Sequence, residues 1–337
     1  MCIEGSRHDS KPSRGRGVGI VRVAVTGANG FVGRALGANL CDAGHALTAL
    51  VRRPGGCDPR ALECVIPDDN FASIAAGTVN IGVADVLVHL AARVHVMQDS
   101  AADPLAEYRA ANVEGALNAA RAALRAGVKR IVFVSSIKAL GEREPGHPWR
   151  ETDHPAPTDP YGMTKLEAER QLLGFGQEQG VEVVVLRPPL VYGPGVRANF
   201  EALMKAVDRG VPLPLGAIDA QRSMVSSANL ADAIRFLATR PEPTEGIFHV
   251  TDGHDFTVAQ MIQALARALG KRARLVAVPV SWLRAAGRLS GRSPQVDRLT
   301  SPLRLDSTRL REGLGWQPPL TVEQGLADTA RAFREAR

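Results

Sequence analysis

The stretch from Val21 to Gly33, which reads VRVAVTGANGFVG, decides the fold. Its β-branched first half predicts a short buried strand, and the apolar positions after Gly33 recur with a helical period. A glycine-rich turn between a strand and a helix lets the backbone approach a pyrophosphate, whose charge then lies at the positive end of the helix. The spacing is GxxGxxG, one residue longer than the common dinucleotide motif.

Each glycine of this turn has an expected role. Gly27 allows the tight turn, Gly30 the close approach of the phosphates, and Gly33 the packing of helix on strand. Glycine motifs also occur in ordinary turns, but this one follows a strand, opens a helix and begins the folded region. We therefore expect cofactor contacts from Gly27, Asn29, Gly30, Phe31, Val32 and Gly33.

Further strands and helices alternate along the chain. Apolar runs predict strands over 46–51, 85–90, 130–134 and 181–186, while 108–126 reads as a long helix that Gly127 ends. The segment before residue 85 has no clear assignment. Such alternation predicts an α/β fold, a Rossmann-type, doubly wound parallel sheet covered by helices on both faces.

Prolines and glycines interrupt this rhythm after Arg187 and predict a smaller C-terminal lobe that binds substrate. The expected division is a disordered basic tail over 1–19, a dinucleotide-binding domain over 20–190 and a mainly substrate-binding lobe over 191–337. The strand-like run at 246–251 is expected to return to the main sheet.

Composition narrows the functional classes. The 337 residues carry a formal net charge of +6, but no basic stripe interleaved with aromatic residues indicates a nucleic-acid partner. Scattered arginines suit an anionic phosphate ester. The four cysteines show neither a disulfide framework nor metal-ligand spacing, so no metal is expected. No apolar run approaches the ~18 residues of a membrane helix. We expect a cytoplasmic homodimer with no membrane partner.

The predicted second strand ends in Arg52 and Arg53. An acidic residue at this place usually binds the ribose hydroxyls of NAD, whereas an arginine suits the 2′-phosphate of NADP. The alternative is that both arginines are solvated surface residues. The sequence favours NADP and leaves NAD open.

Tyr161 and Lys165 lie one helical turn apart on one face. Tyrosine, with a pKa of about 10, is a poor acid or base at neutral pH, and a neighbouring ammonium lowers that pKa. Ser136 follows the strand at 130–134, at the edge of the sheet where ligands bind, although it could be a turn residue. Asn112, a poor helix former within a predicted helix, either orients a group near the tyrosine or faces solvent.

Together these motifs resemble the extended short-chain dehydrogenase/reductase family, and within it the nucleotide-sugar epimerase/dehydratase group. The resemblance covers about Ile20 to Thr329. It rests on the segments His89-Leu90-Ala91-Ala92, Asn112-Val113-Glu114-Gly115, Val134-Ser135-Ser136, Tyr161-Gly162-Met163-Thr164-Lys165, Leu186-Arg187-Pro188, Val191-Tyr192-Gly193-Pro194 and Leu314-Gly315-Trp316-Gln317-Pro318.

The resemblance implies roles for individual residues. Tyr161 is the acid/base, Lys165 lowers its pKa and holds the nicotinamide ribose, and Ser136 bonds the sugar C4 oxygen. Residues implied to contact the cofactor are Leu90, Ala91, Ala92 and Pro188. Those implied to bind substrate are Arg222 on the diphosphate, Arg298 as a second phosphate ligand and Asn199 on the nucleotide side.

The stretch from Ile137 to Gly141 departs from the common family pattern and is similar to bacterial 4-ketoreductases and epimerases that make deoxy-aminosugars for surface polysaccharides. The favoured function is an NADPH-dependent reduction at C4 of a UDP-4-keto-6-deoxy-aminosugar. One alternative is a 4-epimerase with retained NAD, in which hydride leaves C4, the ketone rotates and hydride returns to the other face. A non-catalytic dinucleotide-sensing module is a further alternative. A dehydratase is disfavoured, because Ile137 and Lys138 stand where its carboxylates are expected.

Overall fold

The computed structural model describes residues 19–94 and 103–336. Apart from Gly19, the tail predicted over 1–19 lies outside these ranges.

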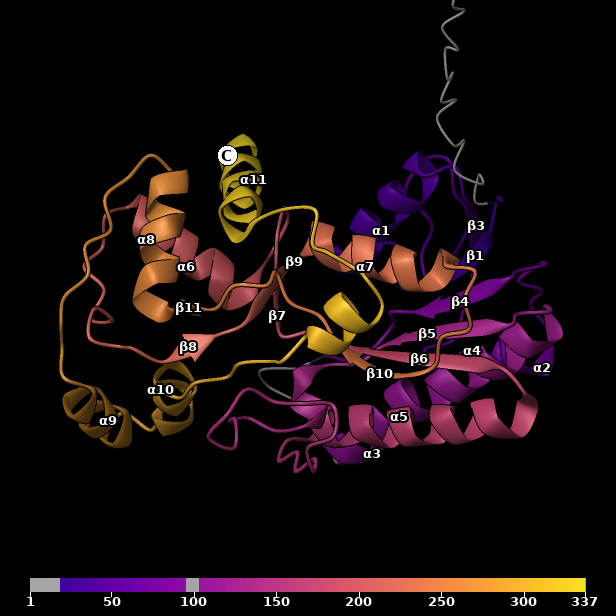
Figure 1. Cartoon of the computed structure of the whole chain (residues 1–337), viewed down its shortest axis with the longest axis horizontal. Coiled ribbons are helices and arrows are strands. Elements are labelled where there is room, and N and C mark those ends of the chain that lie inside the picture. The colour runs from indigo at the N-terminus through magenta and orange to yellow at the C-terminus, as the bar shows by residue number, and fades with distance from the viewer. Residues whose placement is uncertain (1–18, 95–102, 337) are drawn as a thin grey trace, which may run out of the picture.

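A parallel sheet of seven strands, in the order β10-β6-β5-β4-β1-β2-β3, forms the centre of the described chain (Figure 1). The strands are β1 (Arg22–Thr26), β2 (Ala46–Val51), β3 (Leu62–Val65), β4 (Val86–His89), β5 (Arg130–Val134), β6 (Glu182–Arg187) and β10 (Gly246–His249). The predicted fold class is confirmed. The strand order reverses at β1, which pairs with β2 on one side and β4 on the other, and ligands bind at such a switch point.

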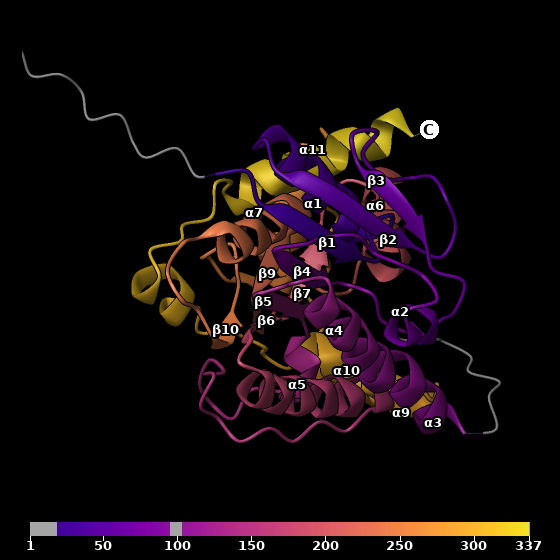
Figure 2. The same ribbon diagram turned by 90° about the vertical axis from the view of Figure 1, so that its right-hand side faces the viewer.

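Helices cover both faces of the sheet, as Figure 2 shows. On one face α1 (Phe31–Asp42) and α7 (Ser227–Thr239) bury Leu36 and Ile234 against the strands. On the other face lie α2 (Ala72–Ala76), α3 (Pro104–Arg109), α4 (Gly115–Arg125) and α5 (Pro160–Gln179). The single helix predicted over 108–126 begins earlier, at Pro104, and a π-helical turn at Ala110–Glu114 separates α3 from α4.

A second apolar core lies beside the sheet. It is enclosed by α6 (Ala198–Asp208), α8 (Val258–Ala268) and α11 (Val322–Glu335). Two small sheets pair β7 (Leu190–Tyr192) with β9 (Met224–Ser226), and β8 (Gln221–Arg222) with β11 (Phe256–Thr257). The remaining helices are α9 (Val280–Leu289) and α10 (Ser293–Thr300). Since β10 and α7 also come from beyond residue 190, the C-terminal half of the chain builds part of the main sheet layer as well as this lobe.

The glycine loop closes tightly on the start of α1. Gly27 has φ +70°, a conformation that side chains other than glycine rarely adopt. A Cβ atom at Gly33 would lie 2.3 Å from the carbonyl oxygen of Gly27 and 2.5 Å from that of Ala28. The sequence suggested that Gly33 serves helix–strand packing; in the structure its missing side chain makes room for the carbonyls of the loop itself.

Replacing Gly33 tests this constraint. We expect Gly33→Ala to destabilise the protein by about 1–3 kcal/mol, because the loop backbone must shift to accept the methyl group. Gly174→Ala is the matched control: Gly174 lies inside α5 with nothing within 4 Å of the added carbon. That change should stabilise by roughly 0.5–1 kcal/mol through helix propensity. Urea unfolding measures both, and a harmless Gly33→Ala would contradict the packing described.

Candidate active site

The loops after β1 and β4 meet at the carboxyl edge of the sheet. The Thr26 hydroxyl accepts hydrogen bonds from the backbone N–H groups of Leu90 and Ala91, each at 3.2 Å. A Cβ atom on Gly27 would lie 3.1 Å from the Ala91 nitrogen. The structure thus brings together two predicted cofactor segments, the glycine loop and the residues after His89.

The beginning of α1 has the features of an anion site. Gly30 caps the helix without a side-chain hydrogen bond, and the first turn contains no acidic residue. The first N–H groups of a helix have no acceptor within it, and together with the helix dipole they favour a bound phosphate. The N–H groups concerned are those of Phe31, Val32 and Gly33, so the predicted residues fit a dinucleotide pyrophosphate.

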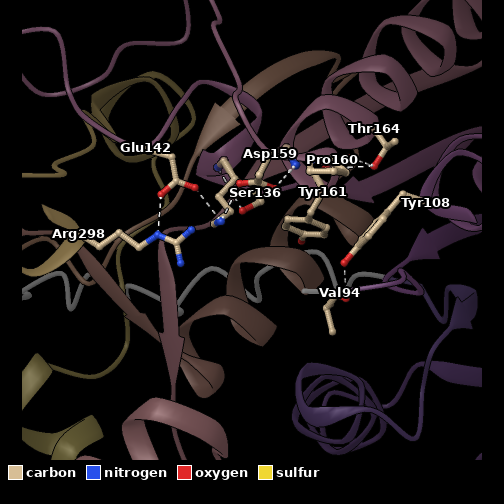
Figure 3. A network of polar contacts seen from close by, with 11 residues as sticks. Val94, Tyr108, Ser136, Glu142, Asp159, Pro160, Tyr161, Thr164 and Arg298 are labelled. Carbon is tan, nitrogen blue, oxygen red and sulfur yellow. Dashed lines mark hydrogen bonds and ion pairs between the residues drawn. The ribbon is translucent and has the colours of Figure 1, made fainter. Parts of the chain in front are cut away.

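Tyr161 lies in the first turn of α5, beside Ser136 (Figure 3). Asp159 caps this helix by accepting a hydrogen bond from Gly162 N at 2.9 Å. Burial raises the pKa of the Tyr161 phenol to about 12; its interaction with the Ser136 side chain opposes that shift, and the Asp159 charge adds to it. The phenol is therefore protonated at neutral pH, and the structure brings the serine and tyrosine hydroxyls together.

Lys165 is buried beneath the same site, with 1% of its surface exposed. Its Nζ donates to the carbonyl oxygen of Val134 at 2.7 Å and lies 4.1 Å from the centre of the Phe133 ring. Burial lowers the pKa of Lys165 to about 7, and the charge of Glu169 acts in the opposite direction. Burial raises the phenol pKa, and the Lys165 ammonium donates to the backbone of β5; that Lys165 lowers the pKa of Tyr161 stays a prediction.

His89, at the end of β4, packs between the rings of Phe71 and Phe133. Its Nδ1 lies 3.0 Å from the Thr26 hydroxyl. Burial, with a smaller effect of the Lys165 charge, lowers the pKa of His89 to about 3, so this imidazole is neutral. Its place in the motif was visible in the sequence, but its burial next to the lysine was not.

Asn112 is buried, with 1% of its surface exposed, so the solvent-facing alternative is wrong. Its side chain accepts from Arg93 N at 2.7 Å and donates to Arg93 O at 3.2 Å. It also donates to the Thr164 hydroxyl at 3.1 Å. Asn112 therefore connects the segment after β4 to α5, at Thr164, the residue before Lys165. Among the described residues, it forms no hydrogen bond with Tyr161.

Comparison with known proteins agrees with this geometry. Residues 23–251 match the model of the NAD dependent epimerase/dehydratase family. A UDP-glucose 4-epimerase from Vibrio cholerae is 40% identical over 324 residues, which cover 93% of this chain and 96% of that protein. The chain belongs to the NAD dependent epimerase/dehydratase family. The expected resemblance is thereby confirmed, and the chain is an NAD-dependent enzyme.

Two further relatives show the range of this family. A GDP-6-deoxy-D-mannose reductase from Pseudomonas aeruginosa is 29% identical, over 90% of this chain and 94% of that protein. Among solved structures, Thermus thermophilus UDP-glucose 4-epimerase in complex with NAD has a TM-score of 0.75 and 25% identity, covering 94% of this chain and 100% of that one. This chain is thus similar to both reductases and epimerases of the family.

The arginines expected to select the cofactor differ in their surroundings. Arg52 forms an exposed ion pair with Asp69, with 2.5 Å between Nη1 and Oδ1. The Asn29 side chain donates to the backbone carbonyl of Arg53 at 3.1 Å, which places Arg53 beside the glycine loop. Arg52 therefore has a carboxylate partner at the surface, and of the two only the Arg53 side chain has no ion pair within the described chain. Because an exposed ion pair of this kind contributes little, Arg52 stays able to bind a phosphate, and the choice of NADP stays a prediction.

Arg222 and Arg298, the expected phosphate ligands, lie together. The Nη1 atom of Arg222 donates to the carbonyl oxygens of Arg298 at 2.5 Å and Ser301 at 3.1 Å. Burial lowers the pKa of Arg222. Asn199 is exposed in the first turn of α6, and Pro188 is buried after β6, where its carbonyl accepts from Ile137 N at 3.0 Å.

Sequence reasoning missed a charged cluster between the tyrosine and these arginines. Lys138 Nζ lies 2.8 Å from the carboxylates of both Glu142 and Asp159. The other Glu142 oxygen accepts from Arg298 Nε at 3.0 Å, and Figure 3 shows this chain of contacts. Hydrogen bonds from its neighbours outweigh burial and lower the pKa of Asp159 to about 2. The spacing of Lys138 and Glu142, four residues apart, was the only signal in the sequence.

The buried ammonium of Lys165 makes stability depend on pH. A lysine whose pKa is about 7 in the folded protein, against an ordinary value of 10.5, binds fewer protons when folded than when unfolded. Its penalty is complete below about pH 7 and disappears as the pH rises toward about 10.5. We expect Lys165→Met to raise the melting temperature clearly at about pH 6 and little at about pH 9.5, while turnover is lost. An increase of equal size at both pH values, measured by calorimetry, would show that the lysine is not desolvated as described.

Arg222 can be tested by kinetics. Arg222→Ala should raise KM for a nucleotide sugar much more than it lowers kcat, because a diphosphate contact lies far from the reacting carbon. Arg209→Ala, at an exposed position after α6, is the control and should change neither constant. An unchanged KM in Arg222→Ala would remove this arginine from the substrate site.

Proposed function

We propose that this enzyme is a 4-epimerase of UDP-hexoses or their N-acetylamino forms, working with a retained NAD. The observation that carries the proposal is the 40% identity to a UDP-glucose 4-epimerase, which extends over 93% of the chain and therefore over both the sheet and the C-terminal lobe. The sequence alone favoured a reductase because of Arg52 and Arg53. The identity to an epimerase over nearly the whole chain is a broader argument than two arginines at the end of one strand.

The described residues support a chemical role for each member of the site. Bound NAD would supply the hydride acceptor and a positive charge beside the phenol. Ser136 and Tyr161 would hydrogen-bond the C4 hydroxyl, and the tyrosine oxygen would take its proton as C4 is oxidised. In the reverse step Tyr161 returns that proton to the C4 oxygen, on whichever face of the ketone hydride is added.

The raised pKa of Tyr161 sets a condition on this chemistry. A phenol with a pKa of about 12 is almost entirely protonated at neutral pH and cannot accept a proton, so formation of the phenolate needs positive charge close to it. The Lys165 ammonium and the oxidised nicotinamide are the charges that could provide it. Binding of the cofactor and formation of the base are coupled in this proposal.

The test is interconversion of UDP-glucose and UDP-galactose, or of their N-acetyl forms, without added cofactor. Tyr161→Phe should lose about 10²–10⁴-fold or more of that activity and still bind NAD, because the ring still packs. Tyr108→Phe is the matched control: this nearby tyrosine donates to the Val94 carbonyl at 3.0 Å and is given no part in the chemistry. Activity of Tyr161→Phe within a few-fold of the wild type would refute the assignment.

A 4-ketoreductase is the second candidate. It is favoured by Arg53, which lies beside the glycine loop where a 2′-phosphate is expected, and by the similarity to a GDP-6-deoxy-D-mannose reductase. A reductase consumes NADPH in proportion to product and shows no epimerisation without added cofactor. The same assay, followed by the absorbance of the nicotinamide, separates the two candidates.

A further inference from the structure

The helix α9 has two apolar faces, and one of them faces solvent. Val280, Leu283 and Gly287 lie on the side that packs toward the protein. Trp282 and Leu289 lie on the opposite side, with 70% and 91% of their surfaces exposed. Ala285 and Ala286 are exposed between them, so the solvent-facing positions recur at i, i+3, i+4 and i+7 along the helix.

The segment that contains α9 also carries the positive charge of the chain. Seven lysine and arginine residues lie within residues 271–300, against the single acidic residue Asp297. They are Lys271, Arg272, Arg274, Arg284, Arg288, Arg292 and Arg298. This gives the segment a formal net charge of +6, equal to that of the whole protein, so the rest of the sequence is balanced. The excess of positive charge is therefore confined to one continuous segment of the chain.

The α9–α10 surface, defined as residues 271–300, lies at one end of the long axis of the molecule, opposite α2 and β3 (Figure 1). All seven of its cationic residues are exposed, and Leu299 of α10 is exposed as well. Arg272, Arg288 and Arg292 form no ion pair within residues 19–94 and 103–336. Exposed tryptophan and leucine flanked by unpaired arginines are typical of helices that lie in a membrane interface.

We propose that the α9–α10 surface binds the surface of an anionic lipid bilayer. Trp282 and Leu289 would enter the headgroup region while the arginines bind lipid phosphates. Two copies of this surface facing each other would bring Arg272, Arg288 and Arg292 of each copy together without acidic partners from residues 271–300 other than Asp297, which disfavours self-association through it. No helix in the described parts of the chain can span a bilayer, so the contact would be peripheral and reversible. This proposal departs from the expectation of no membrane partner, which attributed the arginines to an anionic phosphate ester.

Trp282 provides a direct probe. Of the three tryptophans, Trp149 and Trp316 are only 6% and 2% exposed, so a change in the surrounding solvent reports on Trp282. The full chain is mixed with vesicles of phosphatidylcholine alone or with added phosphatidylglycerol, and both fluorescence and flotation are measured. We expect a blue shift and co-flotation only with the anionic vesicles, reversed by high salt.

Substitutions decide whether this surface is responsible. The variant with Arg272, Arg288 and Arg292 all changed to Gln should bind anionic vesicles at least about 10-fold more weakly, and Trp282→Ser, measured by flotation, should also bind them more weakly. The control changes the same number of exposed arginines elsewhere, Arg170, Arg209 and Arg334, to Gln. Nucleotide-sugar turnover without vesicles should stay the same in every variant, which shows that each is folded.

Three outcomes would overturn the proposal. Equal weakening in both triple variants would mean that net charge alone, or the basic residues before Gly19, causes the binding. Equal binding to neutral and anionic vesicles would contradict the role of the arginines. Absence of binding to the anionic vesicles by the wild type would refute the proposal outright.

Discussion

The hydrogen bond from the Lys165 ammonium to the carbonyl of Val134, 2.7 Å long, holds the active site together. Val134 ends β5 and Lys165 lies in α5, so this one contact fixes the helix against the strand end from which Ser136 follows. A buried amine is costly unless it is hydrogen-bonded, and here the Val134 oxygen and the Phe133 ring face share its charge. The helix cannot slide along the sheet without breaking that bond, and Tyr161 therefore stays beside Ser136.

The same helix continues into a second buried charge. Glu169, one turn after Lys165, forms an ion pair with Arg187 at the end of β6, with 2.5 Å between Nη2 and Oε2. Both side chains are almost completely buried, and removing one partner of such a pair leaves an uncompensated charge. The face of α5 toward the sheet thus carries polar anchors where most helices of this fold bury only apolar groups. These polar contacts fix the position of α5 along the sheet, and catalysis needs that fixed position because it keeps Tyr161 beside Ser136.

The loop after Ser136 and the segment that follows α10 are joined by a row of ion pairs as well as by a small apolar cluster of Ile137, Leu140, Trp149, Leu303 and Leu305. Glu142 and Arg298, Arg143 and Asp297, and Glu144 and Arg304 pair in succession, so the loop after Ser136 is tied to the segment around α10. The first two pairs are solvated and contribute little, whereas the Glu144 side chain is only 2% exposed and is held by Arg304 through both its backbone and its guanidinium. The carboxylate of Glu142 forms an ion pair with Arg298, the residue that the sequence leads us to expect as a phosphate ligand.

Much of the fold could be predicted from local pattern. The run from Val21 to Gly33 predicted the first strand, the turn and the helix, and the strands at 46–51 and 130–134 have the observed bounds. Leu62–Val65 was missed because this edge strand is short and half exposed, so it shows no apolar period. Tyr161, Lys165 and Ser136 could be named because spacing on one helix and position at a strand end are local properties. The position of Lys138 between Glu142 and Asp159, and the burial that raises the pKa of Tyr161, depend on packing between distant segments and leave no local trace.

The central claim is that hydride removed from C4 returns to the same sugar through one active site, without exchange with free cofactor. The most direct measurement uses a UDP-hexose deuterated at C4, incubated with the enzyme and an excess of unlabelled NADH and NADPH. The account predicts that the epimerised product keeps its deuterium at C4, as read by mass spectrometry. Replacement of the deuterium by hydrogen from the free nicotinamide pool would contradict it.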